Sequence, residues 1–397
     1  MRRLAAAAAA AALALLPAVP AHADAVRDAD WALDALHARD AWKRTRGAGV
    51  TVAVLDTGVD GTHPDLAGQV LEGKDMVGFG ARRGDPTWAK HGTGMAGIIA
   101  GRGHGPGRSE GVLGIAPEAR ILPVRVILEE KDPQRKKART QRGSALAEGI
   151  RWAADHGADV INLSLGDDSR TAHPEAQEDE AVQYALRKGV VVVASAGNGG
   201  EEGNRVSYPA AYPGVIAVTA VDRYGFRAAF STRRWYATVA APGVDVVVAD
   251  PNRRYYEGWG TSTASAYVSG VAALVRSAYP RLSPAQVRRL LADTARNTPA
   301  GGRDDAVGHG MVDPAAALKA AAKLEPEAPV PSAAPHPREY FGAGPDAARP
   351  AAADDGKTAG DGIALVCAAA GAVLLVAATL LRMRPRRTAV PDGRRYG

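Results

Sequence analysis

Short apolar runs alternate with amphipathic stretches from Val50 to about Leu324. Five runs rich in Val, Ile and Leu predict buried strands: "VTVAVLD" (50–56), "RILPVRV" (120–126), "DVINLSL" (159–165), "VVVVASA" (190–196) and "VIAVTAV" (215–221). The stretches "SALAEGIRWAADHG" and "EDEAVQYALRKG" have helical periodicity and end at glycine. Continuous apolar strands separated by helices predict an α/β fold with a mostly parallel sheet covered on both faces. In such sheets the chemistry lies at the carboxyl ends of the strands.

Two further apolar segments lie near the ends of the chain. Residues 1–23, "MRRLAAAAAAAALALLPAVPAHA", have a basic start, an Ala/Leu run and a small-residue ending, which predicts a secretory signal peptide cleaved before Asp24. Residues 363–381 form a 19-residue stretch without a charge, which is long enough to span a hydrocarbon core of about 30 Å. The arginines that follow predict a cytoplasmic C-terminus. We therefore expect a single-pass protein of the cell membrane with its folded part outside the cytoplasm.

These patterns divide the chain into six predicted parts. The segment after the signal peptide is polar and helix-like, and the segment before the membrane span is rich in Pro, Ala and charge, which is typical of an extended stalk. The parts are a signal peptide (1–23), an N-terminal extension (24–48), a folded α/β domain (49–324), a stalk (325–360), a transmembrane helix (361–382) and a basic cytoplasmic tail (383–397). Within the folded domain, the charged segment 129–143 is predicted to be a solvated surface loop.

Charge and cysteine content exclude several function classes. Of the formal net charge of +6, the signal peptide contributes +2 and residues 382–397 contribute +5, so the exported part carries about −1. A nearly neutral domain lacks the basic surface of a nucleic-acid-binding protein. The single cysteine, Cys367, lies in the predicted membrane span. The exported part therefore has no disulfide, no cysteine nucleophile and no cysteine-based zinc site.

Three motifs place an aspartate, a histidine and a serine at the edge of the predicted sheet. "AVLDTGVDGTHPDL" puts Asp56 at the exit of a buried strand, while "HGTGMAGIIAG" and "GTSTASAYVSG" put His91 and Ser262 at the starts of two helices. A serine hydroxyl becomes a nucleophile when an imidazole takes its proton, and a carboxylate fixes the tautomer of that imidazole. The three residues therefore predict acyl transfer with Ser262 as the nucleophile. Ser262 is also a candidate cap of its helix.

A fourth motif supplies a hydrogen-bond donor for the transition state. "VVVVASAGNGG" ends a predicted strand, and the Asn198 amide is predicted to donate to a tetrahedral oxyanion together with the backbone N–H of Ser262. The order Asp, His, Ser argues against a lipase or esterase of the α/β-hydrolase type. That fold requires Gly-x-Ser-x-Gly and the order Ser, Asp, His.

The four motifs resemble those of the subtilisin-like serine proteases. The similarity extends from Val50 to Leu318 and includes "INLSLG", "YPAAYPGVIAVTAVD" and "APGVDV". This resemblance implies a subtilisin-like three-layer fold for residues 49–324 and serine endopeptidase activity on proteins or peptides, without a cofactor. We further expect a substrate peptide to lie extended along the backbone of Ser164, Leu165 and Gly166.

The whole plan of the chain resembles the mycosins, membrane-anchored proteases that accompany type VII secretion in actinobacteria. This similarity implies secretion membrane components as partners and an N-terminal extension that wraps the catalytic domain. Cleavage before Asp24 makes Asp56 the thirty-third residue of the mature chain, which leaves too little sequence for an inhibitory pro-domain of the subtilisin kind. A tethered scaffold that stabilises a secretion complex, with catalysis dispensable, is the alternative function.

The sequence departs from the usual subtilase pattern near two of these motifs. Thr263, Ala266 and Tyr267 stand where many subtilases have Met, Pro and His, and these positions bear on the packing of the helix after the serine. Lys90 stands where a small or polar residue is commoner, next to the cleft edge.

Calcium is the one metal that the resemblance brings into question. Many subtilases bind it, and Asp65 in "HPDL" lies where a ligand is often found. Because calcium takes 6–8 oxygen ligands, one carboxylate is too few, and we predict no metal site.

Overall fold

The computed structural model describes residues 25–327. The predicted signal peptide, transmembrane helix and basic tail, and nearly all of the predicted stalk, lie outside the described residues. Within 25–327, no helix is long and apolar enough to cross a membrane.

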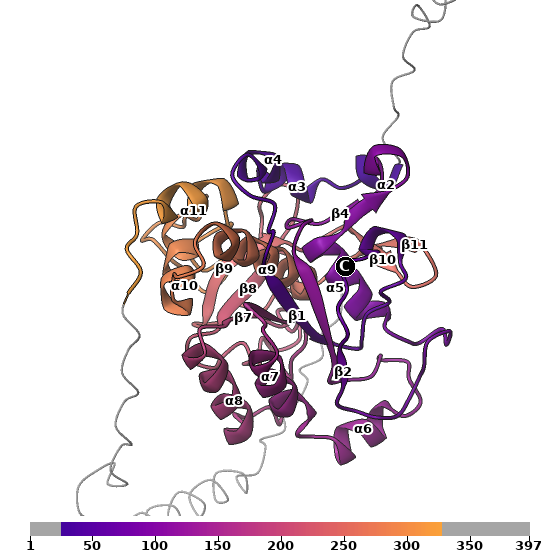
Figure 1. Ribbon diagram of the computed structural model, residues 1–397. Coiled ribbons are helices and arrows are strands. Elements are labelled where there is room, and N and C mark those ends of the chain that lie inside the picture. Colours follow the sequence, from indigo (N-terminus) through magenta and orange to yellow (C-terminus); the bar gives the residue numbers. More distant parts are fainter. Residues whose placement is uncertain (1–24, 328–397) are drawn as a thin grey trace, which may run out of the picture. The chain divides into compact units, whose positions relative to one another are not determined.

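A seven-stranded sheet forms the centre of the domain, in the order β2-β5-β1-β6-β7-β8-β9 (Figure 1). All its pairings are parallel, which confirms the predicted α/β class. The strands are β1 (Thr51–Asp56), β2 (Lys74–Asp75), β5 (Arg120–Arg125), β6 (Val160–Leu163), β7 (Val191–Ser195), β8 (Ile216–Val221) and β9 (Ala237–Pro242). The five predicted strands are confirmed, whereas β2 and β9 were not predicted.

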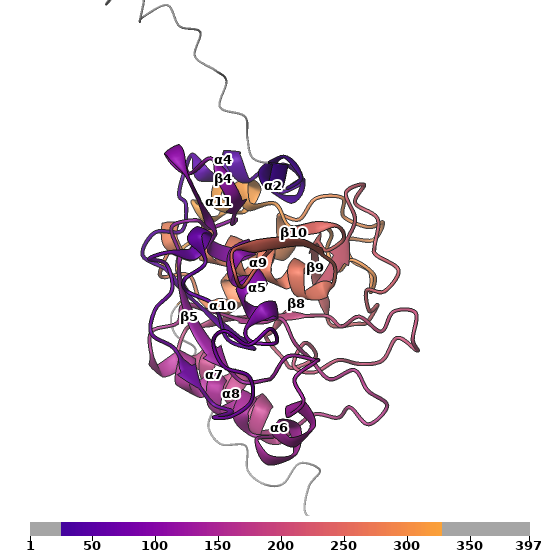
Figure 2. The same ribbon diagram turned by 90° about the vertical axis from the view of Figure 1, so that its right-hand side faces the viewer.

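Helices cover both faces of the sheet, as Figures 1 and 2 show. The helices are α7 (Ala145–Asp155) and α8 (Ala176–Arg187) on one face, and α5 (Lys90–Ala100), α9 (Thr261–Ala278), α10 (Pro284–Asp293) and α11 (Pro314–Ala321) on the other. Successive side chains of β1 alternate between the two cores: Val52 and Val54 join the α5/α9 side, and Ala53 and Leu55 join the α7/α8 side. A strand buried on both faces therefore appears in the sequence as a continuous apolar run.

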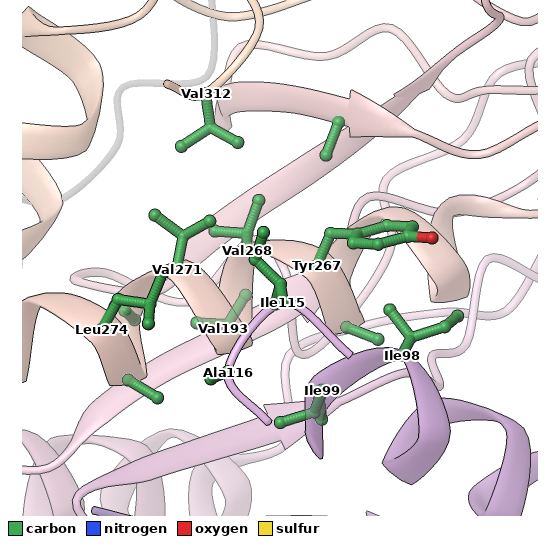
Figure 3. Close-up of a cluster of buried hydrophobic side chains, with 14 of the residues drawn as sticks. Ile98, Ile99, Ile115, Ala116, Val193, Tyr267, Val268, Val271, Leu274 and Val312 are labelled. Atoms are coloured by element: carbon green, nitrogen blue, oxygen red, sulfur yellow. The ribbon is translucent and has the colours of Figure 1, made fainter. Parts of the chain in front are cut away.

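The core on the α9 side fixes the position of that helix. Figure 3 shows Tyr267, Val268, Val271 and Leu274 of α9 packed against Ile98 and Ile99 of α5 and the loop residue Ile115. A Cβ atom at Gly270 would lie 1.8 Å from Ile115, so only glycine permits this close approach. Because α9 carries Ser262 at its start, this packing also sets where the serine lies.

The N-terminal extension folds onto the same core. It forms three short helices, α2 (Ala25–Asp28), α3 (Ala32–Ala35) and α4 (Ala38–Trp42). Leu36 is fully buried, and the Trp42 indole N–H donates to the Ile115 carbonyl at 2.8 Å. At its other side α4 packs on α11, where His37 Nδ1 lies 3.3 Å from Asp313 Oδ2. The extension is therefore part of the folded domain.

Two small hairpins, a short α-helix and two 3-10 helices, η1 (Pro64–Leu66) and η2 (Pro106–Arg108), complete the described fold. The hairpins pair β3 (Arg102–His104) with β4 (Glu110–Leu113), and β10 (Val246–Asp250) with β11 (Arg254–Gly258). The prediction that segment 129–143 is only a loop is wrong, because α6 (Arg135–Gln141) forms within it. Its residues, Arg, Lys, Ala, Thr and Gln, are mostly strong helix formers, and their charge concealed that propensity.

Candidate active site

Asp56 and His91 form a tight pair at the carboxyl end of the sheet. Asp56 is the last residue of β1 and is 1% exposed, and its two carboxylate oxygens lie 2.8 and 2.9 Å from His91 Nδ1. A Cβ atom at Gly92 would lie 2.1 Å from the Gly58 carbonyl oxygen, so glycine lets the start of α5 approach the turn after β1. Because a carboxylate only accepts hydrogen bonds, Nδ1 carries a proton and Nε2 of the neutral ring is a free base.

Glu129 adds a second negative charge beside this pair. Its Oε1 atom accepts a hydrogen bond from the backbone N–H of His91 at 2.7 Å. Burial by itself lowers the pKa of His91, but the charge and hydrogen bond of Asp56 and the charge of Glu129 raise it to about 9. Glu129 belongs to the segment predicted as a loop, and sequence patterns gave no sign of this contact.

Ser262 is the second residue of α9 and shares a cavity of about 340 Å³ with Asp56 and His91. Its hydroxyl donates to the Ser164 carbonyl oxygen at 3.1 Å, and within residues 25–327 no hydrogen bond joins it to His91. The prediction that Ser262 caps its helix is wrong. The N-cap is Gly260, whose φ of 138° favours glycine, and it has no side-chain cap.

Asn198 lines the same cavity, in the loop after β7. Its side-chain oxygen accepts two hydrogen bonds from Thr261, one from the backbone N–H and one from the hydroxyl, both at 2.9 Å. These bonds fix the orientation of the amide, because an N–H donor requires the oxygen to face it. The NH₂ group of Asn198 therefore remains as a donor. The role of Thr261 was not predicted, although it immediately precedes Ser262.

Residues 164–166, predicted to bind substrate through their backbone, also line this cavity. The Ser164 side chain has a different environment. Its hydroxyl is buried, donates to the Ser262 carbonyl oxygen at 3.0 Å, contacts Ser265 Oγ at 2.9 Å and accepts from Asn162 Nδ2 at 2.9 Å. These bonds hold the first turn of α9 against the end of β6.

The subtilase departures lie outside the cavity. Thr263, Ala266 and Tyr267 are buried in α9, and the Tyr267 hydroxyl donates to Asp30 of the N-terminal extension at 3.5 Å. Lys90 does not line the cavity, although its neighbour His91 does. Its ammonium group lies 4.5 Å from the centre of the Tyr256 ring.

The environment of Asp65 does not fit calcium. This carboxylate is fully buried, and Oδ1 lies 2.6 Å from His104 Nδ1. Oδ2 accepts hydrogen bonds from the Val112 N–H at 2.9 Å and from the Tyr255 hydroxyl at 2.8 Å. Both carboxylate oxygens of Asp65 therefore face N–H and O–H donors. A calcium ion would need further oxygen ligands at these positions. In the described part of the chain, no group of three or more His, Cys, Asp or Glu residues is arranged to hold a metal ion.

The comparison with protein families defines the class. Residues 47–310 match the Subtilase family. The chain therefore belongs to the subtilase family, which confirms the predicted family. The chain is 38% identical over 315 residues to fervidolysin from Fervidobacterium pennivorans, with 73% of this chain and 43% of fervidolysin covered. It thus spans less than half the length of that relative.

Comparison with solved structures shows a similarity to particular proteases. MycP1 from the ESX-1 type VII secretion system superposes with a TM-score of 0.63 at 32% identity, over 80% of this chain and 91% of that chain. The MycP3 protease from the type VII (ESX-3) secretion system gives a TM-score of 0.60 at 34% identity, over 76% and 90%. The predicted resemblance to mycosins is confirmed as a similarity of sequence and structure.

Proposed function

We propose that this protein is a membrane-anchored, extracytoplasmic serine endopeptidase linked to type VII secretion. The observation that carries the proposal is the single cavity lined by the Asp56–His91 pair, Ser262 and Asn198. An aspartate-bound imidazole, a serine and an oriented amide donor are the groups that peptide hydrolysis by an acyl-enzyme requires.

In the proposed reaction, Ser262 attacks a peptide carbonyl carbon while His91 Nε2 takes its proton. The hydroxyl first turns away from the Ser164 carbonyl oxygen, which costs about the 1 kcal/mol of a neutral hydrogen bond. Asp56 stabilises the imidazolium that forms. The Asn198 NH₂ group and the Ser262 backbone N–H donate to the oxyanion. His91 then protonates the leaving amine and later activates the water that hydrolyses the acyl-enzyme.

The N-terminal extension does not obstruct this proposed reaction. None of its described residues, 25–48, lines the cavity of Ser262. Its helices pack instead on β4, α11 and the core around α9. This arrangement supports an extension that stays in place in the active enzyme, in keeping with the wrapping implied by the mycosin resemblance.

The location and partners rest on two kinds of support. The predicted signal peptide (1–23), stalk (325–360) and membrane span (363–381) place the domain outside the membrane on a tether. The likeness to MycP1 and MycP3, whose structures are described as parts of type VII secretion systems, supports secretion membrane components as partners. We propose that the substrates are proteins that emerge near this membrane.

A membrane-impermeant fluorophosphonate probe on intact cells tests activity and location together. We expect labelling of the wild type and none of Ser262→Ala, with Ser277→Ala, a hydroxyl removed from the same helix away from the cavity, labelled normally. Labelling of Ser262→Ala contradicts the assigned nucleophile. Labelling in lysed but not in intact cells contradicts the extracytoplasmic location and leaves the assignment of Ser262 as the nucleophile intact. If secretion survives in Ser262→Ala, the scaffold function is favoured over catalysis as the essential role.

A further inference from the structure

A second, larger cavity adjoins the one that Ser262 lines. Its volume is about 890 Å³, and the two cavities share Ile127, Arg135, Leu165 and Gly166 in their linings. A peptide that lies along residues 164–166 therefore passes from the first cavity into the second. We call the part of the peptide that lies in the second cavity the arm of the substrate. The side chains of this arm contact the charged residues that line the second cavity.

One wall of this second cavity is formed by the basic helix α6 and the residues after it. Arg135, Arg139 and Arg142 all line it. The Arg135 guanidinium donates to the Leu128 carbonyl oxygen, and Arg142 donates to the Met76 carbonyl oxygen at 2.7 Å and pairs with Glu148. The Arg139 side chain is exposed and forms no hydrogen bond or ion pair with any residue in 25–327.

Arg135 and Arg139 are one helical turn apart, so their charges interact unfavourably. Burial, and after it the charge of Arg139, lower the pKa of Arg135. An anion bound between the two guanidinium groups relieves this repulsion. Arginine also suits a carboxylate better than lysine does, because its planar guanidinium presents two parallel donors.

The opposite wall carries carboxylates that already accept hydrogen bonds or, for Glu175, form an ion pair. Glu175 Oε1 lies 3.0 Å from His173 Nε2. Glu178 accepts a hydrogen bond from the Tyr212 hydroxyl at 3.1 Å, and burial raises its pKa. Asp167 Oδ1 accepts a backbone N–H at 2.9 Å. Among the charged side chains that line this cavity, Arg139 is therefore the one without a hydrogen-bond or ion-pair partner within residues 25–327.

We propose that the second cavity selects substrates with an aspartate or glutamate on the arm that lies along residues 164–166, and that Arg139 sets this preference. This proposal rests on the proposed endopeptidase function, whose substrates it narrows to acidic segments. Arg139 acts as a specificity-determining residue because it meets the substrate side chain in the second cavity and does not line the cavity of Ser262.

The test uses the full-length protein in detergent and a set of fluorescence-quenched peptides. A single Glu is moved through each position on both sides of the scissile bond, and each peptide is compared with its Gln counterpart by kcat/KM. We expect Glu to be preferred by about two- to fivefold, at one or two neighbouring positions on one side only, as for an exposed ion pair. Arg139→Glu should reverse this ratio in favour of Gln or Lys. Lys136→Glu makes the same charge change on α6 at a residue that does not line the cavity, and should keep the wild-type ratio.

The same peptides are also used as competitors of fluorophosphonate labelling, which measures binding without cleavage. A wild type that shows no preference for Glu at any position in either assay overturns the proposal about Arg139, while labelling of Ser262 leaves the endopeptidase function intact. A preference that is lost in Lys136→Glu but kept in Arg139→Glu also overturns it. Absence of both cleavage and Ser262 labelling overturns the endopeptidase function itself.

Discussion

Two regions of the molecule contain almost the same pair of residues. In one, Asp56 holds His91 through Nδ1 at 2.8 Å, and in the other Asp65 holds His104 through Nδ1 at 2.6 Å. Both carboxylates are buried, and the two imidazoles are 35% and 33% exposed. The geometry of the pair therefore does not by itself distinguish a candidate catalytic site from a structural contact.

The difference lies on the other side of each imidazole. His104 Nε2 is 3.4 Å from Glu110 Oε2, and Asp65 is held further by Val112 and Tyr255. His91 instead faces a cavity of about 340 Å³ that Ser262 also lines. The Asp65–His104 pair also binds a second acid, Glu110, and so holds three chain segments together. The Asp56–His91 pair instead lies in a cavity beside a serine, an arrangement suited to proton transfer.

The largest effect is expected from Asp56→Asn. Without the carboxylate, the His91 tautomer and the stabilisation of its imidazolium are lost, so kcat should fall by about 10⁴-fold while the fold is retained. Peptide hydrolysis and thermal unfolding followed by circular dichroism measure the two quantities. If Asp56→Asn mainly lowers Tm and spares kcat, this pair is structural like the one at Asp65.

Asn198→Ala should have the next largest effect. Its NH₂ group is assigned only to the oxyanion, so kcat should fall by about 10²–10³-fold, the range measured for such a donor in subtilisin, a member of the same family. KM should change little, because the interaction forms in the transition state. Steady-state kinetics with one peptide separate the two parameters. A rise in KM at constant kcat contradicts the assignment and makes Asn198 a ground-state binding residue.

Asp65→Asn should show the reverse of Asp56→Asn. Asp65 binds His104, Val112 and Tyr255 inside the protein, so the free energy of unfolding should fall by about 1–3 kcal/mol with kcat nearly unchanged. Chemical denaturation of the wild type with and without a calcium chelator provides a control, and no shift is expected from this site. A loss of kcat as large as that of Asp56→Asn would show that the two pairs are functionally coupled.

The smallest effect is expected from Glu129→Gln. The charge of Glu129 raises the pKa of His91, which accepts the serine proton only when neutral, so activity should increase as the pH rises towards about 9. Removing that charge lowers the pKa, and the acid limb of kcat/KM should move to lower pH. The neighbouring Glu130→Gln is the control, because Glu130 does not bond the His91 backbone. An unchanged limb in Glu129→Gln, measured from pH 5 to 10, would contradict this electrostatic role.

Local patterns predicted much of the fold because buried parallel strands are continuous apolar runs, as at residues 190–196 for β7. β9, "ATVAAP", is buried along its whole length but has one β-branched pair, Thr238 and Val239, among alanines and a proline, so its composition gave little strand signal. The prediction for segment 129–143 was wrong for another reason. The charge of the segment suggested a solvated loop, although its residues favour a helix.

The candidate site was predictable where one short motif carried the chemistry. Asp56, His91, Asn198 and Ser262 each stand in such a motif, and the structure lines one cavity with all four. Their supporting contacts were not predictable, because the partners are distant in sequence. Glu129 lies 38 residues from His91, whose backbone N–H donates to it. Thr261 lies 63 residues from Asn198, and His104 lies 39 residues from Asp65.

The contact of α4 with α11 has a consequence for how this domain reaches its folded state. His37 and Asp313, which pair across this contact, are 276 residues apart in the sequence. Closing so long a loop costs chain entropy, and folds dominated by distant contacts form slowly. The contact of this N-terminal segment with α11 therefore forms late, whereas its contacts with β4 and Ile115 close much shorter loops. A chain that ends before residues 314–321 would have an incomplete core, because Ala317, Leu318 and Ala321 belong to it.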